Sequence, residues 1–186
     1  MTVVAKPIKN IFGLLLLVSL VGLHTQDILA QSRQKVEKIR KDAIDAKTEF
    51  LESDWRMEKH FNKSYGYVIF PNVGKGAVGI GGAAGNGVAY EGGKEIGMAK
   101  LSQLSIGFQW GGQAYREVIF FEDKDAMDRF KENKIEFAAQ ASAVAVTEGA
   151  SANARYVDGV MVFTMQKGGL MYEASVGGQK FRFDAF

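Results

Sequence analysis

The chain has 186 residues, of which 22 are glycine, two are proline, two are histidine and none is cysteine, and its formal charge is +2. The absence of cysteine excludes a disulfide framework, a thiolate zinc site and thiol catalysis, and the small charge argues against a nucleic-acid-binding protein. With 47% hydrophobic residues, few prolines and no regular glycine period, the chain is neither disordered nor collagen-like.

The first thirty residues have the plan of a secretory signal peptide. Lys6 and Lys9 precede thirteen uncharged residues at 11–23, which is short for a bilayer span of about 20 residues. Ile28 and Ala30 occupy the −3 and −1 positions of a cleavage site. We therefore expect cleavage after Ala30 and an exported domain over residues 31–186, periplasmic or secreted and peripheral to a membrane. The alternative is an uncleaved membrane anchor.

Residues 32–59 predict one amphipathic helix, because they contain neither glycine nor proline and their apolar residues recur every three or four positions. The apolar stripe consists of Val36, Ile39, Ala43, Ala46, Phe50 and Met57. The other face carries a nearly balanced set of basic and acidic residues. Two interpretations stay open: the stripe packs on the rest of the domain, or it lies on lipid.

From residue 64 onward, short β-prone runs alternate with Gly-Gly turns at 92–93, 111–112, 168–169 and 177–178. Fourteen of the 22 glycines lie between Gly66 and Gly112, where they would permit bends and bulges. A short helix is expected at about 123–133, with Asp123 as its N-cap. The predicted fold is α+β: a strongly curved antiparallel sheet, with closure into a barrel as one form of it, packed by both helices.

The motifs that would indicate catalysis or nucleotide binding lack their structural context. Gly74–Gly79 matches G-x-G-x-x-G, but the glycines that continue to Gly87 cannot sustain the helix that a dinucleotide site needs. His60 has no metal-ligand spacing around it and no partner for nucleophilic catalysis. We therefore expect a protein that is not an enzyme and that has no cofactor and no metal site.

Several ordered blocks resemble the SYLF domain family. They are residues 66–71 with the glycine-rich stretch to 87, residues 105–112, residues 118–121 with the helix that follows, and residues 168–178. The resemblance covers about 66–184, and the helix at 32–59 fits the family layout. It implies a non-enzymatic phospholipid-binding protein of the bacterial cell envelope. Some relatives bind actin, which an exported protein would not meet, and no nucleic acid is implied.

In the family, a basic amphipathic helix at the start of the domain contacts phosphoinositide membranes. The resemblance therefore implies lipid contacts on the helix at 32–59. The apolar candidates are Val36, Ile39, Ala43 and Phe50. The basic candidates are Lys35, Lys38, Arg40, Lys41 and Lys47, with Lys75 in the glycine-rich stretch. The alternative is a structural or scaffolding envelope protein whose protein contacts are made by Phe181, Phe183 and Phe186.

Overall fold

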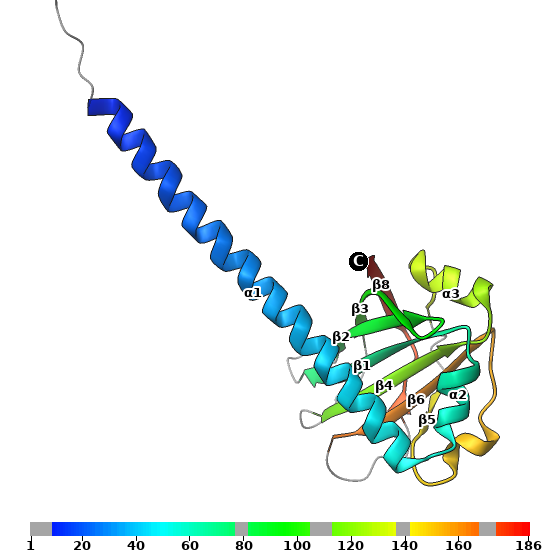
Figure 1. Ribbon diagram of the computed structural model, residues 1–186. Helices are drawn as coiled ribbons and strands as arrows, with labels where there is room; N and C mark the ends of the chain where they lie inside the picture. Colours follow the sequence, from blue (N-terminus) through cyan, green and yellow to red (C-terminus); the bar gives the residue numbers. More distant parts are fainter. Residues whose placement is uncertain (1–8, 77–81, 105–112, 137–141, 168–173) are drawn as a thin grey trace, which may run out of the picture. The chain divides into compact units, whose positions relative to one another are not determined.

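The computed structural model describes residues 9–76, 82–104, 113–136, 142–167 and 174–186 (Figure 1). The chain divides into an N-terminal unit, Met1–Lys38, and a compact unit, Ile39–Phe186. Helix α1 (Lys9–Ser53) begins in the first unit and ends in the second. None of the helices in the described ranges combines the length and the apolar composition needed to cross a membrane.

The compact unit is α+β, as predicted, and holds an eight-stranded sheet among its described residues. Its helices after α1 are α2 (Met57–Lys63), α3 (Lys124–Lys131) and the 3-10 helix η1 (Ala150–Asn153). Its strands are β1 (Gly66–Gly76), β2 (Gly82–Glu91), β3 (Lys94–Leu104), β4 (Gln113–Phe121), β5 (Ser142–Ala145), β6 (Val160–Gln166), β7 (Ala174–Ser175) and β8 (Gln179–Ala185). The strand order is β7-β5-β6-β4-β1-β2-β3-β8.

The predicted antiparallel sheet is confirmed, and the structure adds two details to it. The sheet is mixed, because β5 pairs in parallel with β6, and residues 146–159 with η1 supply the crossover that a parallel pair requires. The sheet is also open across its described strands, since the order ends at β7 on one edge and β8 on the other.

Glycines are required in the sheet at turns and where two backbones approach closely. Gly92 and Gly93 join β2 to β3 with φ of 56° and 78°, a conformation that favours glycine, so this predicted turn is confirmed. A Cβ on Gly87 would lie 2.4 Å from the carbonyl oxygen of Ile69, beside the register shift of β1 at Ile69–Asn72. The predicted turns at 111–112 and 168–169 lie outside the described residues.

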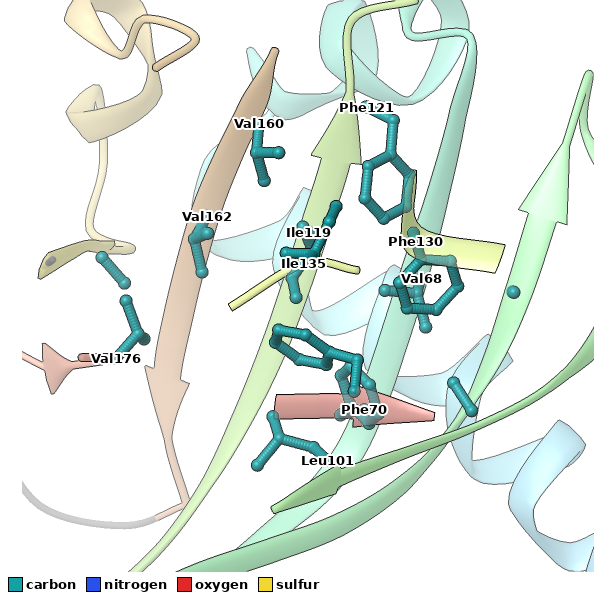
Figure 2. Packing of buried hydrophobic residues seen from close by; sticks show 14 of the residues in the cluster. Val68, Phe70, Leu101, Ile119, Phe121, Phe130, Ile135, Val160, Val162 and Val176 are labelled. Atoms are coloured by element: carbon teal, nitrogen blue, oxygen red, sulfur yellow. The ribbon is translucent and has the colours of Figure 1, made fainter. Parts of the chain in front are cut away.

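Both faces of the sheet are packed. On one face, α3 contributes Ala126, Met127 and Phe130 to a cluster that includes Val68, Phe70, Leu101, Ile119 and Phe121 (Figure 2). On the other, α1 and α2 contribute Ala43, Ala46, Phe50, Met57 and Phe61, which pack on Tyr67, Ile69, Val88, Phe120 and Phe163. The sheet therefore has a helical cover on each side over part of its area.

The predicted helix at 32–59 is two helices, and its predicted start is wrong. Helix α1 begins at Lys9, because only Gly13 and Gly22 interrupt an otherwise helix-compatible run. It ends at Ser53, and α2 begins at Met57. The predicted helix at 123–133 is confirmed as α3, where the Asp123 side chain accepts a hydrogen bond from the Ala126 N–H at 2.8 Å.

Candidate functional site

The apolar stripe of α1 in the compact unit is packed on the sheet. Ala43 and Phe50 are fully buried, and Ile39 packs at the edge of the same cluster. These predicted lipid contacts are therefore core residues in this conformation, and they could meet lipid only if α1 left the sheet. Val36, which belongs to the N-terminal unit, is half-buried on α1.

Arg40 and Lys47, which are among the predicted phosphate-binding cations, contact other side chains of the protein. Arg40 Nε donates to Glu95 Oε2 at 2.6 Å, and its guanidinium lies 5.5 Å from the ring centre of Phe186. Lys47 Nζ donates to the Tyr67 hydroxyl at 3.2 Å and lies 4.7 Å from the ring centre of Phe61. These contacts attach α1 to the sheet.

The remaining predicted cations are Lys35, Lys38, Lys41 and Lys75. Lys41 is exposed on α1, and Lys35 and Lys38 are exposed in the N-terminal unit. Lys75 lies in β1 opposite Ala83 of β2, and its side chain is outside the described part of the chain. Within the compact unit, the predicted basic residues whose side chains are described are therefore Arg40, Lys41 and Lys47, and two of these contact the sheet.

A buried carboxylate forms the corner between α1 and α2. Asp54 is 1% exposed, and its Oδ2 accepts hydrogen bonds from Ser151 Oγ at 2.6 Å and from Ser151 N–H at 2.9 Å. Its Oδ1 accepts from the Arg56 N–H at 3.1 Å. Burial by itself raises the pKa of Asp54, but these hydrogen bonds together outweigh burial and hold the pKa below 3.8. The corner is thus fixed to η1, and the helix turns there.

A groove of about 630 Å³ lies between this corner, α2 and η1. It is lined by Trp55, Arg56, Glu58, Lys59, His60, Asn62, Lys63, Ser151, Ala152 and Ala154. Trp55 is 67% exposed, and the Arg56 guanidinium lies 5.1 Å from its ring centre. Three cations and one acid line the groove, so it has a basic character with an exposed aromatic ring at its rim.

His60 connects α2 to η1 beside this groove. Its Nε2 lies 3.2 Å from the carbonyl oxygen of Ser151, and because a carbonyl only accepts, the Nε2–H must be the donor. The ring packs 5.8 Å from Phe120 and 5.6 Å from Phe163, measured between ring centres. His60 thus has a positioning role. Across the described ranges, no group of three or more His, Asp or Glu residues is arranged to hold a metal ion.

The basic groove was not among the predicted sites, although the sequence holds a signal for it. Trp55 follows the apolar stripe but departs from its spacing, and Arg56, Lys59 and Lys63 come directly after it. An aromatic residue at this position does not fit the buried stripe, and the cations after it are three or four positions apart. Together they indicate an exposed surface with both aromatic and basic side chains. The groove exists because the helix is interrupted at Asp54, and the sequence pattern did not predict this interruption.

The aromatic anchors of the scaffolding alternative are only partly available. Phe181 is 5% exposed and Phe183 is half-buried. Phe186 is exposed beside Arg40. The expected exposure of Phe181 is therefore wrong, because β8 directs this ring toward Phe70 and Phe130 in the core.

Part of the chain matches a domain known from other proteins. Residues 102–185 match the Ysc84 family model, described as a Las17-binding protein actin regulator, and this is the SYLF domain. The resemblance to the SYLF family that the sequence blocks predicted is thus confirmed over residues 102–185.

The chain is also similar in sequence to a protein named Beta cell expansion factor A, from Aeromonas veronii. The two are 32% identical over 126 residues, which cover 67% of this chain and 48% of that protein. The chain thus spans about half the length of this curated relative, and the match concerns the shared region alone.

Proposed function

We propose that this protein binds phospholipid membranes without catalysing a reaction, and that it does so through the Trp55 groove between α2 and η1. The observation that carries the proposal is the exposed Trp55 ring at the rim of a groove with three cations and one acid. Tryptophan favours the membrane–water interface, where its apolar body and its N–H are both satisfied. Each cation near an anionic surface contributes about 1 kcal/mol.

Contact through this groove needs no rearrangement of the core. Contact through the α1 stripe would first expose Phe50, Ala43 and Ala46, which are buried against the sheet. Exposing a buried phenylalanine side chain alone costs about 1.5–3 kcal/mol. The groove, by contrast, is accessible in the folded domain.

The expected export of the protein indicates which membrane it would contact. We propose that a signal peptide at residues 1–30 directs it to the cell envelope, where phospholipid surfaces are the available partner. The match to the SYLF domain supports the proposal of lipid binding in general, and the exposed Trp55 ring supports the proposal that the contact is made at this groove.

The two tryptophans of the chain, Trp55 and Trp110, allow a direct test. In a Trp110→Phe variant, Trp55 is the remaining emitter. We expect its fluorescence to shift to shorter wavelength on addition of vesicles of equal parts phosphatidylglycerol and phosphatidylcholine, and to be quenched by brominated acyl chains. High salt should weaken both effects. Absence of vesicle co-sedimentation at low salt would refute the function, and co-sedimentation with unchanged Trp55 emission would refute the site.

A substitution series separates the groove from general surface hydrophobicity. Trp55→Ala should lower vesicle affinity about tenfold, which corresponds to about 1.4 kcal/mol. Ile44→Ala is the matched control, because Ile44 is similarly exposed on α1 but lies outside the groove. It should leave vesicle affinity unchanged. Equal losses in both variants would contradict the assignment of the membrane contact to the Trp55 groove.

A further inference from the structure

A second groove, of about 580 Å³, lies over strands β1, β2, β3 and β8. It is lined by Asn72, Gly74, Ala84, Gly85, Asn86, Lys100, Leu101, Ser102, Lys180, Phe181 and Arg182. None of these residues belongs to the Trp55 groove, and none belongs to a helix. We call this surface the sheet-face groove.

The strand register explains how the groove is built. Residues that are directly paired across neighbouring strands lie on the same face of a sheet. One row across β1, β2, β3 and β8 is Gly74, Ala84, Ser102 and Lys180. The next row is Asn72, Asn86, Lys100 and Arg182. Small and amide side chains thus lie over β1 and β2, and cations lie over β3 and β8.

The charge of the groove is of one sign. Its lining contains Lys100, Lys180 and Arg182 and no acid. The acids that pair with these cations lie outside the lining. Asp184 lies 3.2 Å from Arg182 Nε and 3.7 Å from Lys100 Nζ. Glu136 lies 3.4 Å from Lys180 Nζ. The cations are all more than half exposed, and exposed ion pairs of this kind are worth about 0–1 kcal/mol. An anionic ligand can therefore recruit them.

The groove also has room and neutral hydrogen-bonding groups. A Cβ on Gly74 would meet no atom within 4 Å, so open space lies above this position. Asn72 and Asn86 present exposed amides, and Ser102 presents an exposed hydroxyl. Amides and hydroxyls both donate and accept, and they suit a ligand that carries hydroxyl groups as well as negative charge.

We propose that the sheet-face groove binds the headgroup of an anionic phospholipid, with its phosphate on Lys100, Lys180 and Arg182 and its hydroxyls on the Asn72, Asn86 and Ser102 side. Lysine and arginine are the usual partners of phosphate, and no other charge in the lining opposes them. This inference rests on the proposed membrane function, but it assigns headgroup recognition to a surface separate from the Trp55 groove.

The test compares three variants of the whole protein in co-sedimentation with vesicles of phosphatidylglycerol and phosphatidylcholine. The triple variant Lys100→Gln, Lys180→Gln, Arg182→Gln removes the charge of the groove. Gly74→Leu fills the groove without changing the charge. The control Lys94→Gln, Lys124→Gln, Lys134→Gln removes the same charge from exposed positions outside both grooves. Circular dichroism checks that each variant is folded.

We expect the groove triple variant to lose about tenfold or more in affinity, Gly74→Leu to lose several-fold, and the control to lose clearly less than the groove triple. The inference would be overturned if the wild-type protein binds, the two triple variants lose equal affinity and Gly74→Leu loses none. The proposed function would then still stand. Failure of the wild-type protein to bind vesicles would overturn both.

A soluble probe separates the lipid from a free phosphate compound. Glycerol 3-phosphate carries the same phosphate and hydroxyl chemistry as the phosphatidylglycerol headgroup but has no acyl chains. It should shift the backbone amide resonances of Gly74, Ala84 and Ser102 only weakly. Tight, saturable binding of glycerol 3-phosphate at these residues, with vesicles unable to compete, would assign the groove to a soluble ligand and overturn the lipid assignment.

Discussion

At the residue scale, Asp54 decides where the first helix ends and how the corner is held. Its carboxylate accepts hydrogen bonds from Ser151, which lies 97 positions away in the chain. No local pattern marks such an acid, because its spacing and neighbours are those of an ordinary helical surface. By contrast, Asp123 caps α3 through Ala126, three positions on, and the sequence alone predicted that role.

The lowered pKa of Asp54 makes a prediction about acid stability. A carboxyl whose pKa is lower in the folded than in the unfolded state adds stability above its unfolded pKa, near 3.8, and this stability is lost as the pH falls further. Asp54→Asn should cost about 1.5–3 kcal/mol of unfolding free energy at neutral pH, the range for hydrogen bonds to charged groups. Below about pH 4 the difference from the wild-type protein should shrink.

Urea unfolding at neutral pH and between about pH 4 and 3 measures this difference. Asp45→Asn is the control, because Asp45 is exposed on the same helix. It should change the unfolding free energy by less than about 0.5 kcal/mol. A constant difference between Asp54→Asn and wild type across this pH range would show that the Asp54 carboxylate is not the titrating group.

At the element scale, helix periodicity identified the buried stripe of α1 but not its interruption. Ala43, Ala46, Phe50 and Met57 all pack in one cluster, as a single stripe would suggest. Yet Met57 belongs to α2, because the chain turns at Asp54 and re-enters the same cluster. A periodic pattern predicts which side chains are buried together, but it does not predict whether they belong to one helix or to two.

The packing of α1 predicts its behaviour on a membrane. If the Trp55 groove makes the contact, the amides of residues 43–53 should keep their hydrogen-exchange protection when phosphatidylglycerol vesicles are added, because the helix stays on the sheet. Amides near Trp55 and Lys59 should exchange more slowly at the same time. Loss of protection over residues 43–53 on vesicles would show that α1 leaves the sheet and that its stripe enters lipid.

At the scale of the whole molecule, the sequence predicted the α+β class but not the sheet order. The pairing of β3 with β8 and of β4 with β6 joins segments that are distant in sequence, and hydrophobic alternation does not specify partners. Around the apparent phosphate loop at 74–79, β1 continues through Gly76 and β2 begins at Gly82, while the end of the motif lies outside the described residues. The sheet-face groove depends on the pairing of β3 with β8, and the Trp55 groove depends on the contact of Asp54 with the distant Ser151. Neither contact can be inferred from a local pattern, so the residues of both grooves were not predicted.

The division of the chain at Lys38 predicts which part is needed for folding and for lipid binding. Among the side chains that the structure describes, the buried hydrophobic ones begin at Ala43. A chain of residues 39–186 should therefore unfold cooperatively with a free energy within about 0.5 kcal/mol of the form cleaved after Ala30. A chain beginning at Thr48 should be less stable by about 2 kcal/mol or more, since it loses Ala43 and Ala46 from the core.

The chain of residues 39–186 also tests whether the N-terminal unit takes part in lipid binding. Both grooves lie within residues 39–186, so that chain should co-sediment with phosphatidylglycerol vesicles as the longer form does. Lys35, Val36 and Lys38 are absent from it, and a helix-based contact would lose these three residues together. Retained binding would therefore locate the membrane contact in the compact unit. Loss of binding by a stably folded 39–186 chain would instead show that the first part of α1 is the membrane-binding element.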